Sequence, residues 1–170
     1  MDPRDAVKPV IRTAAAADAP VLARLHLQCW RETYCGLLSP AFFARQSVEE
    51  RLALWKVLVS GPIADRQFVA DLHGELVGFA GSIPAASGTP DASSDAQAEL
   101  WGIYLLRAHH GSGLGQQLLD ATIGMEPAAL WVAEANTRAQ AFYRRNGFAF
   151  TGAAEPIEGW EGIIEVRMAR

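Results

Sequence analysis

A glycine-rich run lies between a strand-like and a helix-like segment in the second half of this 170-residue chain. It reads His-Gly-Ser-Gly-Leu-Gly over residues 110–115, after an apolar stretch at 100–106 and before a helical pattern at 116–123. Glycines remove the side chains that would keep a ligand away from the backbone. A loop that opens a helix presents several N–H groups together, and the helix dipole adds partial positive charge there. The run therefore predicts an anion site, most simply for a phosphate, with a flexible turn as the alternative interpretation.

The spacing of these glycines excludes two common nucleotide-binding loops. A P-loop needs Gly-Lys followed by Ser or Thr, and the sequence contains no such run. A dinucleotide-binding loop needs Gly-x-Gly-x-x-Gly near the start of a βαβ unit. Here the third glycine, Gly115, comes one position too early, and Gln116 follows it. A nucleotide-binding protein is therefore the weakest functional hypothesis.

Composition narrows the class of protein further. Half of the residues are apolar and a fifth are charged, as in soluble globular proteins. The net charge is −4 and no block of Lys or Arg occurs, which argues against nucleic acid or an anionic membrane as the main partner. No apolar segment is long enough to cross a bilayer, and no signal peptide is visible. Cys29 and Cys35 form neither a CxxC pair nor a metal-ligand cluster, so we expect reduced thiols, no metal and a cytoplasmic protein.

Apolar periodicity and turn residues predict a mixed α/β fold around one sheet. We expect a loose tail at residues 1–8 and a single domain over 9–170, with a surface loop from Pro84 to Gln97. The predicted strands are Val10–Thr13, Gln67–Leu72, Leu76–Ile83, Glu99–Leu106, Ala129–Ala133, Phe148–Gly152 and Ile163–Met168. The predicted helices run from a cap at Asp18 to about Thr33, from Ser47 to Val59, from Gly113 to Met125 and from Asn136 to Asn146. Ser47 with Glu50 has the spacing of a capping box, and Gly147 is placed to end the last helix.

A second run, at residues 136–148, reads Asn-Thr-Arg-Ala-Gln-Ala-Phe-Tyr-Arg-Arg-Asn-Gly-Phe. Asn136 is placed to cap a helix, and Tyr143 follows about two turns later. The glycine run matches [Gln/Arg]-x-x-Gly-x-[Gly/Ala], and the second run matches Asn-x-x-Ala-x-x-Phe-Tyr-x-x-x-Gly-Phe. With the strand at 99–106, these motifs make the chain resemble the GNAT superfamily of N-acetyltransferases, with the strict match over residues 99–148. The resemblance implies an acyl-CoA N-acyltransferase fold, a central mixed sheet flanked by helices.

The resemblance also implies acetyl-coenzyme A (acetyl-CoA) as the acetyl donor. In this family the strand before the glycine loop and the strand after the following helix splay apart, and the coenzyme arm pairs with the first of them. Carried over to this chain, the coenzyme contacts are Ile103, Tyr104, Leu105, His110, Gly111, Ser112, Gly113, Leu114, Gly115, Gln116, Asn136 and Tyr143. The N–H of Leu105 would bind the thioester carbonyl.

Two residues depart from the family pattern. His110 stands where Gln or Arg is usual, and Ser112 stands where Lys or Arg is common. Both changes remove positive charge beside the phosphates. Coenzyme affinity is therefore expected to be modest unless arginines elsewhere compensate, the candidates being Arg107, Arg144 and Arg145.

Acetyl transfer requires a neutral amine, a polarised carbonyl and a proton for the departing thiolate. Glu99 lies eleven positions before His110, where several family members place a glutamate, so it is the candidate general base; an ordinary surface carboxylate is the alternative. Glu134 and Glu32 are the other candidate bases. Tyr143 is the candidate general acid, since an ordinary tyrosine pKa of about 10 suits a thiol; a core aromatic is the alternative.

The first part of the chain corresponds to the variable, acceptor-facing half of such enzymes. Trp30 and Tyr34 are the candidate acceptor-binding residues, with Phe42 and Phe43 beside them, although aromatic residues at helical spacing are more often core. His26, His73 and His109 lack partners at ligand spacing and are expected to be surface or partly buried histidines, without a metal.

The sequence thus favours an N-acetyltransferase that moves an acetyl group from acetyl-CoA to a primary amine. The acceptor, a small molecule or a peptide or protein, is not identified. Because dimers are frequent among relatives, a homodimer is possible. The competing hypothesis is a non-catalytic acyl-CoA-binding or regulatory module, which the reduced charge at His110 and Ser112 motivates.

Overall fold

A computed structural model describes residues 9–85 and 96–170 of the chain. The tail expected at residues 1–8, and residues 86–95 of the expected loop, lie outside the described residues. The strands are β1 (Val10–Thr13), β2 (Gln67–Leu72), β3 (Glu75–Pro84), β4 (Ala98–Leu105), β5 (Ala128–Ala133), β6 (Ala149–Pro156) and β7 (Ile164–Ala169). The helices are α1 (Ala19–Tyr34), α2 (Pro40–Ala44), α3 (Val48–Ser60), α4 (Leu114–Ile123) and α5 (Thr137–Arg145).

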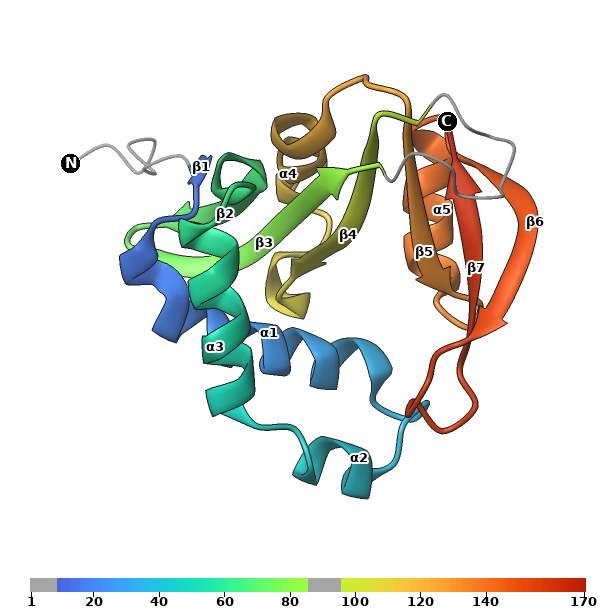
Figure 1. The fold of residues 1–170 in the computed structure, drawn as a ribbon, viewed down its shortest axis with the longest axis horizontal. Coiled ribbons are helices and arrows are strands. Elements are labelled where there is room, and N and C mark those ends of the chain that lie inside the picture. Colours follow the sequence, from blue (N-terminus) through green and yellow to red (C-terminus); the bar gives the residue numbers. More distant parts are fainter. Residues whose placement is uncertain (1–8, 86–95) are drawn as a thin grey trace.

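All seven strands form one mixed sheet in the order β1-β2-β3-β4-β5-β7-β6, and helices cover both faces (Figure 1). One face of β2, β3 and β4 packs against α1 and α3 around Trp55 and Phe79. The other face packs against α4 and α5 around Leu118, Leu119 and Met168. The predicted mixed α/β sheet flanked by helices is therefore confirmed.

The expected elements are all present, and one helix was missed. Ser39 accepts a hydrogen bond from the N–H of Phe42 and Pro40 occupies the first turn, so α2 has an ordinary helix start. With only five residues, α2 carries too little periodicity for the sequence pattern to reveal.

Two of the predicted helix caps, those at Ser47 and Asp18, were only partly correct. Ser47 does accept from the N–H of Glu50, and its hydroxyl donates to Glu49, but among the described residues the Glu50 carboxylate does not accept from the N–H of Ser47, as a capping box requires. Asp18 occupies the cap position of α1 without bonding that helix. Its carboxylate instead accepts from the N–H of Ala15 and pairs with Arg12 on β1 at 2.7 Å. An arginine partner therefore replaces the expected capping bond.

The parallel strands β4 and β5 separate after a short shared stretch. Their register pairs only Ala98–Leu100 with Ala128–Leu130. Beyond Leu100 the two strands diverge, which leaves the wedge visible at the centre of Figure 1. We call this wedge the β4–β5 gap.

A β-bulge interrupts β4 beside the gap. Gly81 pairs with Gly102 and Ser82 with Leu100, so Trp101 is the extra residue. The bulge shifts the alternation of side chains, and Trp101 and Tyr104 therefore both pack on the α1 and α3 face. Gly81 has to be glycine here, because a Cβ would lie 2.3 Å from the indole nitrogen of Trp101.

His26 is a core residue, more deeply buried than the surface or partly buried position expected from the sequence. Its side chain is 3% exposed and packs among the rings of Trp30, Trp55, Phe79, Trp101 and Tyr104. Desolvation, and then the positive charge of Arg51, lower the pKa of His26 from 6.5 to about 3. The aromatic surroundings thus keep this imidazole neutral.

The buried His26 predicts an acid-sensitive fold. Below pH 6.5 the unfolded chain binds a proton at His26 that the folded chain does not bind until about pH 3. This group should therefore lower the free energy of unfolding by about 1.4 kcal/mol per pH unit as the pH falls through that window. Urea denaturation between pH 7 and 5 gives the free energy of unfolding at each pH for the wild type and for His26→Gln. The wild type should show the steeper fall with decreasing pH, and parallel curves would contradict the assignment.

Candidate coenzyme and acceptor cleft

The backbone of β4 presents free groups to the β4–β5 gap at alternate residues. The N–H of Leu106 donates to Val77 of β3, which makes this a hydrogen-bonded pair of the antiparallel ladder. Because such pairs alternate, Tyr104 turns its backbone groups toward β3, whereas Ile103 and Leu105 turn theirs toward the gap. Of the three arm-binding residues expected from the sequence, two therefore offer backbone to a ligand in the gap, and Tyr104 offers only its side chain.

His110 attaches the glycine loop to the end of β4. Its Nε2 atom lies 2.8 Å from the carbonyl oxygen of Leu105. A neutral imidazole that donates from Nε2 satisfies this carbonyl, so the N–H of Leu105 is the group of that residue left facing the gap. The sequence analysis considered His110 only for the charge that it lacks, and did not predict this bond to the backbone of β4.

The loop exposes a group of unpaired N–H donors. Gly111 and Gly113 have φ of 81° and 86°, in the left-handed region that favours glycine. Ser112 donates to the carbonyl of His109 and accepts from the N–H of Leu114, the first residue of α4. Within the described parts of the chain, no acceptor pairs with four N–H groups, those of Gly111, Gly113, Gly115 and Gln116. At the positive end of a helix, such a set suits an anion.

The arginines expected to compensate for His110 and Ser112 are largely committed elsewhere. Arg107 donates two hydrogen bonds to Glu32: its backbone N–H donates to the Glu32 carboxylate at 2.7 Å, and its guanidinium donates to the Glu32 carbonyl. Arg144 lies over the ring of Phe150. Glu32, one of the alternative bases, is therefore a tether between α1 and the end of β4.

Tyr143 projects from α5 into the core beside the gap. Its ring packs against Phe142 and Phe148, and only 6% of the residue is exposed. No described residue hydrogen-bonds its hydroxyl. Burial, and then the nearby hydroxyl of Tyr34, raise the pKa of Tyr143 above its ordinary value. The phenol is therefore protonated at any physiological pH.

Asn136 caps α5 as expected, since its Oδ1 accepts from the N–H of Ala139 at 3.1 Å. The remaining amide group of this side chain is available to a ligand. Glu134, the other alternative base, is exposed after the end of β5.

An aromatic cluster closes the α1 side of the gap. Trp30 and Tyr34 of α1, expected as acceptor-binding residues, are nearly buried and pack against Trp160. The Tyr34 hydroxyl lies 3.3 Å from that of Tyr104 on β4, and Phe42 packs against Trp160 as well. Phe43 in turn packs against Phe42. Trp30 and Tyr34 are thus part of the aromatic core on this side of the cleft.

Trp160 belongs to the turn between β6 and β7, and sequence reasoning missed it. The neighbouring Glu161 accepts hydrogen bonds from the N–H and the hydroxyl of Ser39 at 2.8 and 2.7 Å. The start of α2 is therefore attached to this turn. The available signal was an aromatic residue set in a glycine-rich turn, Gly159-Trp160-Glu161-Gly162.

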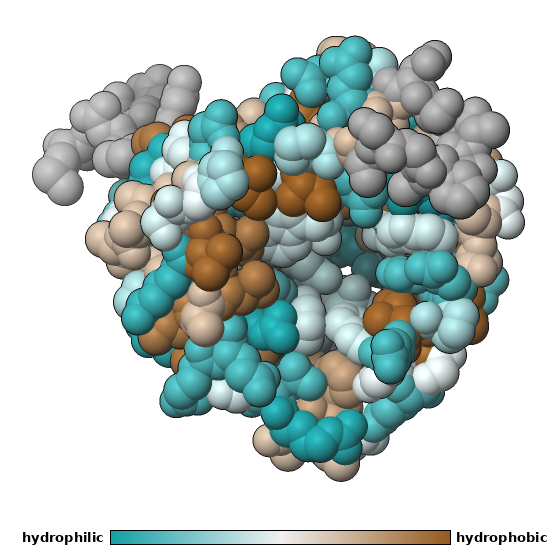
Figure 2. All heavy atoms as spheres, in the orientation of Figure 1, coloured by the Kyte–Doolittle hydropathy of each residue, from teal (hydrophilic) through white to brown (hydrophobic). Residues whose placement is uncertain are grey.

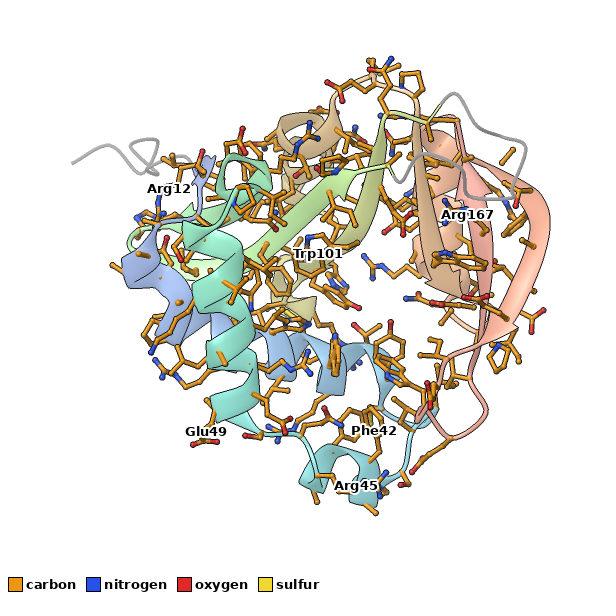
Figure 3. The ribbon with its side chains drawn as sticks, in the orientation of Figure 1. Arg12, Phe42, Arg45, Glu49, Trp101 and Arg167 are labelled. Carbon is orange, nitrogen blue, oxygen red and sulfur yellow. The ribbon has the colours of Figure 1, made fainter. Side chains whose placement is uncertain are left out.

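Charged residues lie on the same face as the aromatic cluster. Leu100 packs on the α4 and α5 face, so its neighbour Glu99 faces the opposite side. Glu99 accepts from the guanidinium of Arg167 at 3.3 Å, and Arg167 lies over the ring of Trp131. Figure 3 shows Arg167 on β7 and Trp101 on β4, on opposite sides of the gap. The candidate base therefore has a cationic partner.

Two further glutamates on this face were missed by sequence reasoning. Glu165 of β7 is directly opposite Glu155 of β6 in the register. Burial first, and then the charges of Glu155 and Glu99, raise the pKa of Glu165. The alternation of apolar and polar residues in 164–168 was the signal that one face of this strand is not core.

The arrangement is a cleft through the sheet with two different sides. Seen in the orientation of Figure 1, the surface is hollowed over the gap (Figure 2). Backbone donors lie on the α4 side, and aromatic rings and carboxylates lie on the α1 side. In residues 9–85 and 96–170 no group of three or more His, Cys, Asp or Glu could hold a metal, and no helix could span a membrane.

Comparison with known proteins gives the same fold. The model of the acetyltransferase (GNAT) family matches residues 23–148. A probable N-acetyltransferase of Mycobacterium tuberculosis, Rv2775, is 24% identical over 166 residues, which is 88% of this chain and 86% of that protein. The crystal structure of the PaiA N-acetyltransferase of Thermoplasma acidophilum in complex with coenzyme A is 20% identical and covers 95% of this chain and 98% of its own, with a TM-score of 0.67. The crystal structure of Ard1 of Thermoplasma volcanium is 18% identical and covers 96% of this chain and 97% of its own, with a TM-score of 0.68.

Proposed function

The chain belongs to the GNAT family of acetyltransferases, and we propose that it transfers an acetyl group from acetyl-CoA to the primary amine of an acceptor. The observation that carries the proposal is the gap that opens after Leu100, with unpaired N–H donors along its α4 side. We further propose that residues 9–170 act as a single domain. The two free thiols, Cys29 and Cys35, fit the cytoplasm as its location.

The residues of the gap fit the chemistry of coenzyme A. The four unpaired N–H groups of the loop suit a diphosphate, and the gap-facing groups of Ile103 and Leu105 suit the amides of the coenzyme arm. Asn136 contributes its remaining amide group at the far side. When bound, acetyl-CoA supplies the acetyl group as a thioester.

The reaction roles follow from the two sides of the cleft. The N–H of Leu105 donates to the thioester carbonyl and stabilises the negative charge that develops there. The hydroxyl of Tyr143 donates to the departing thiolate. A carboxylate of the α1 side, with Glu99 as the candidate from the sequence, accepts a proton from the amine. Trp30, Tyr34 and Trp160 exclude water around the acceptor.

The direct test is turnover of acetyl-CoA with a panel of amines. We expect free thiol to be released only when a suitable amine is present, with the acetylated amine as the second product. A mass-spectrometric search for that product distinguishes transfer from simple hydrolysis. Tight binding of acetyl-CoA without turnover of any amine would instead support a non-catalytic acyl-CoA-binding module.

The glycine loop gives a sharper prediction for coenzyme binding. Gly113→Ala places a residue with a Cβ in the left-handed conformation of Gly113, which costs about 1–2 kcal/mol of backbone strain. It should therefore raise the dissociation constant of coenzyme A by about tenfold or more. Gly115→Ala is the matched control, because its Cβ would meet only Phe142, at 3.9 Å, in ordinary contact. Calorimetry measures the dissociation constant of coenzyme A for both variants. Equal affinities would contradict a diphosphate site at this loop.

A further inference from the structure

A pair of like charges lies on the acceptor side of the cleft without compensation. Glu155 and Glu165 are directly opposite on β6 and β7, and cross-strand neighbours in an antiparallel pair share one face. Like charges in this position destabilise a sheet. Of the residues that the structure describes, no Lys, Arg or His forms an ion pair with either glutamate. Interacting titratable groups whose pKa values are perturbed are concentrated at functional sites.

Glu165 faces the cleft. Its neighbours Val166 and Met168 pack against the α4 and α5 face, so Glu165 lies on the opposite face of β7. There it is paired in the register with Ala133, at the end of β5. Ala133 in turn packs in the cluster that holds Tyr34 and Trp160. Glu165 is thus at the aromatic end of the gap, where the proposed acceptor enters.

The two carboxylates that border the gap differ in their partners. Glu99 is bound to Arg167, which is 7% exposed, and this ion pair balances its charge. Glu165 forms no ion pair with a described residue, its cross-strand neighbour is the carboxylate of Glu155, and it is half-buried. A base that must accept a proton works better without a fixed cation beside it.

We propose that Glu165 is the general base for the acceptor amine and that Glu99, bound to Arg167, is a positioning residue at the other side of the gap. This inference rests on the proposed acetyl transfer. The Glu165 carboxylate takes one proton from the ammonium group and later releases it to solvent. The neutral nitrogen forms the N–C bond as the C–S bond breaks, and Tyr143 gives its proton to the sulfur. The nitrogen loses a second proton as the amide forms, and this proton restores the hydroxyl of Tyr143.

The charged and titratable groups around Glu165 support this role. They come from four elements: Glu155 of β6, Glu99 of β4, Arg167 of β7 and Tyr34 of α1. Burial and the two carboxylates raise the pKa of Glu165, which brings its proton affinity toward the working pH. Removal of one neighbouring negative charge should therefore shift the pH at which the base becomes active.

The test is the pH dependence of kcat/KM for the amine at saturating acetyl-CoA. Glu165→Gln should lower kcat/KM at neutral pH by about 100-fold or more, with the loss recovered as the pH rises and the free amine accumulates. Glu155→Gln leaves the base in place but should move the acidic limb of the profile to lower pH. Glu158→Gln, in the exposed turn after β6, is the matched control and should leave the limb where it is.

Melting temperature and acetyl-CoA affinity separate this role from a structural one. Glu155→Gln removes a like-charge contact and should raise the melting temperature while it alters the profile. Glu165→Gln should bind acetyl-CoA as the wild type does. An acidic limb that stays at its wild-type pH in Glu165→Gln, or that stays unmoved in Glu155→Gln and is displaced in Glu99→Gln, would overturn the assignment and make Glu99 the base. If the wild type acetylates no amine at all, the proposed function itself fails, and this inference fails with it.

Discussion

Replacement of Tyr143 by Phe should lower kcat by about 10²- to 10⁴-fold, the usual range for loss of a general acid. The substitution removes only a hydroxyl that no described residue bonds, and it keeps the ring between Phe142 and Phe148. The affinity for acetyl-CoA should therefore change by no more than about twofold, since the lost interaction belongs to the transition state.

The raised pKa of Tyr143 refines this expectation. A phenol that stays protonated is a stable donor to a developing thiolate, so the wild-type rate should show no basic limb from Tyr143 in the physiological range. Stopped-flow detection of thiol release compares the two proteins, and Tyr34→Phe serves as a control for loss of a nearby hydroxyl. A Tyr143→Phe enzyme with unchanged kcat would remove Tyr143 from the mechanism.

Replacement of Leu105 by Pro should lower kcat by about 10²- to 10³-fold, as expected for loss of one donor to a developing oxyanion. The N–H of Leu105 faces the gap and is not part of the ladder with β3, so proline at this position removes no bond of the sheet. Few strand positions allow a backbone donor to be deleted in this way.

Leu105→Ala is the matched control for this prediction. It loses the same side chain, which packs against the α4 side of the sheet, but keeps the N–H. Both variants should lose similar amounts of stability, which thermal melts would establish. Equal kcat values for Leu105→Pro and Leu105→Ala would show that this N–H does not contact the reacting carbonyl.

Long periodic segments and turn residues were enough to predict the fold. Alternating apolar residues located β2 and β3, and their connection has His73 and Gly74 at positive φ, as a tight hairpin turn requires. The short α2 was not predictable in this way, nor was the β-bulge at Trp101. The bulge depends on how Gly81 and Trp101 meet across two strands, and that information is not local in the sequence.

The candidate site was predictable only where it follows motifs. The glycine loop and the start of α5 are continuous runs, so their residues could be named from the sequence. Glu155, Trp160 and Glu165 come together through the pairing of β6 with β7 and the packing of their turn against α1. No single segment shows that arrangement. The ion pair of Glu99 with Arg167 likewise joins residues 68 positions apart.

A crystal structure of the protein with acetyl-CoA would show directly whether the coenzyme binds in the β4–β5 gap. We expect the diphosphate to lie against the N–H groups of Gly111, Gly113, Gly115 and Gln116, with the arm beside Ile103 and the thioester carbonyl at Leu105. A diphosphate bound elsewhere, or a coenzyme that lies outside the β4–β5 gap, would contradict this expectation.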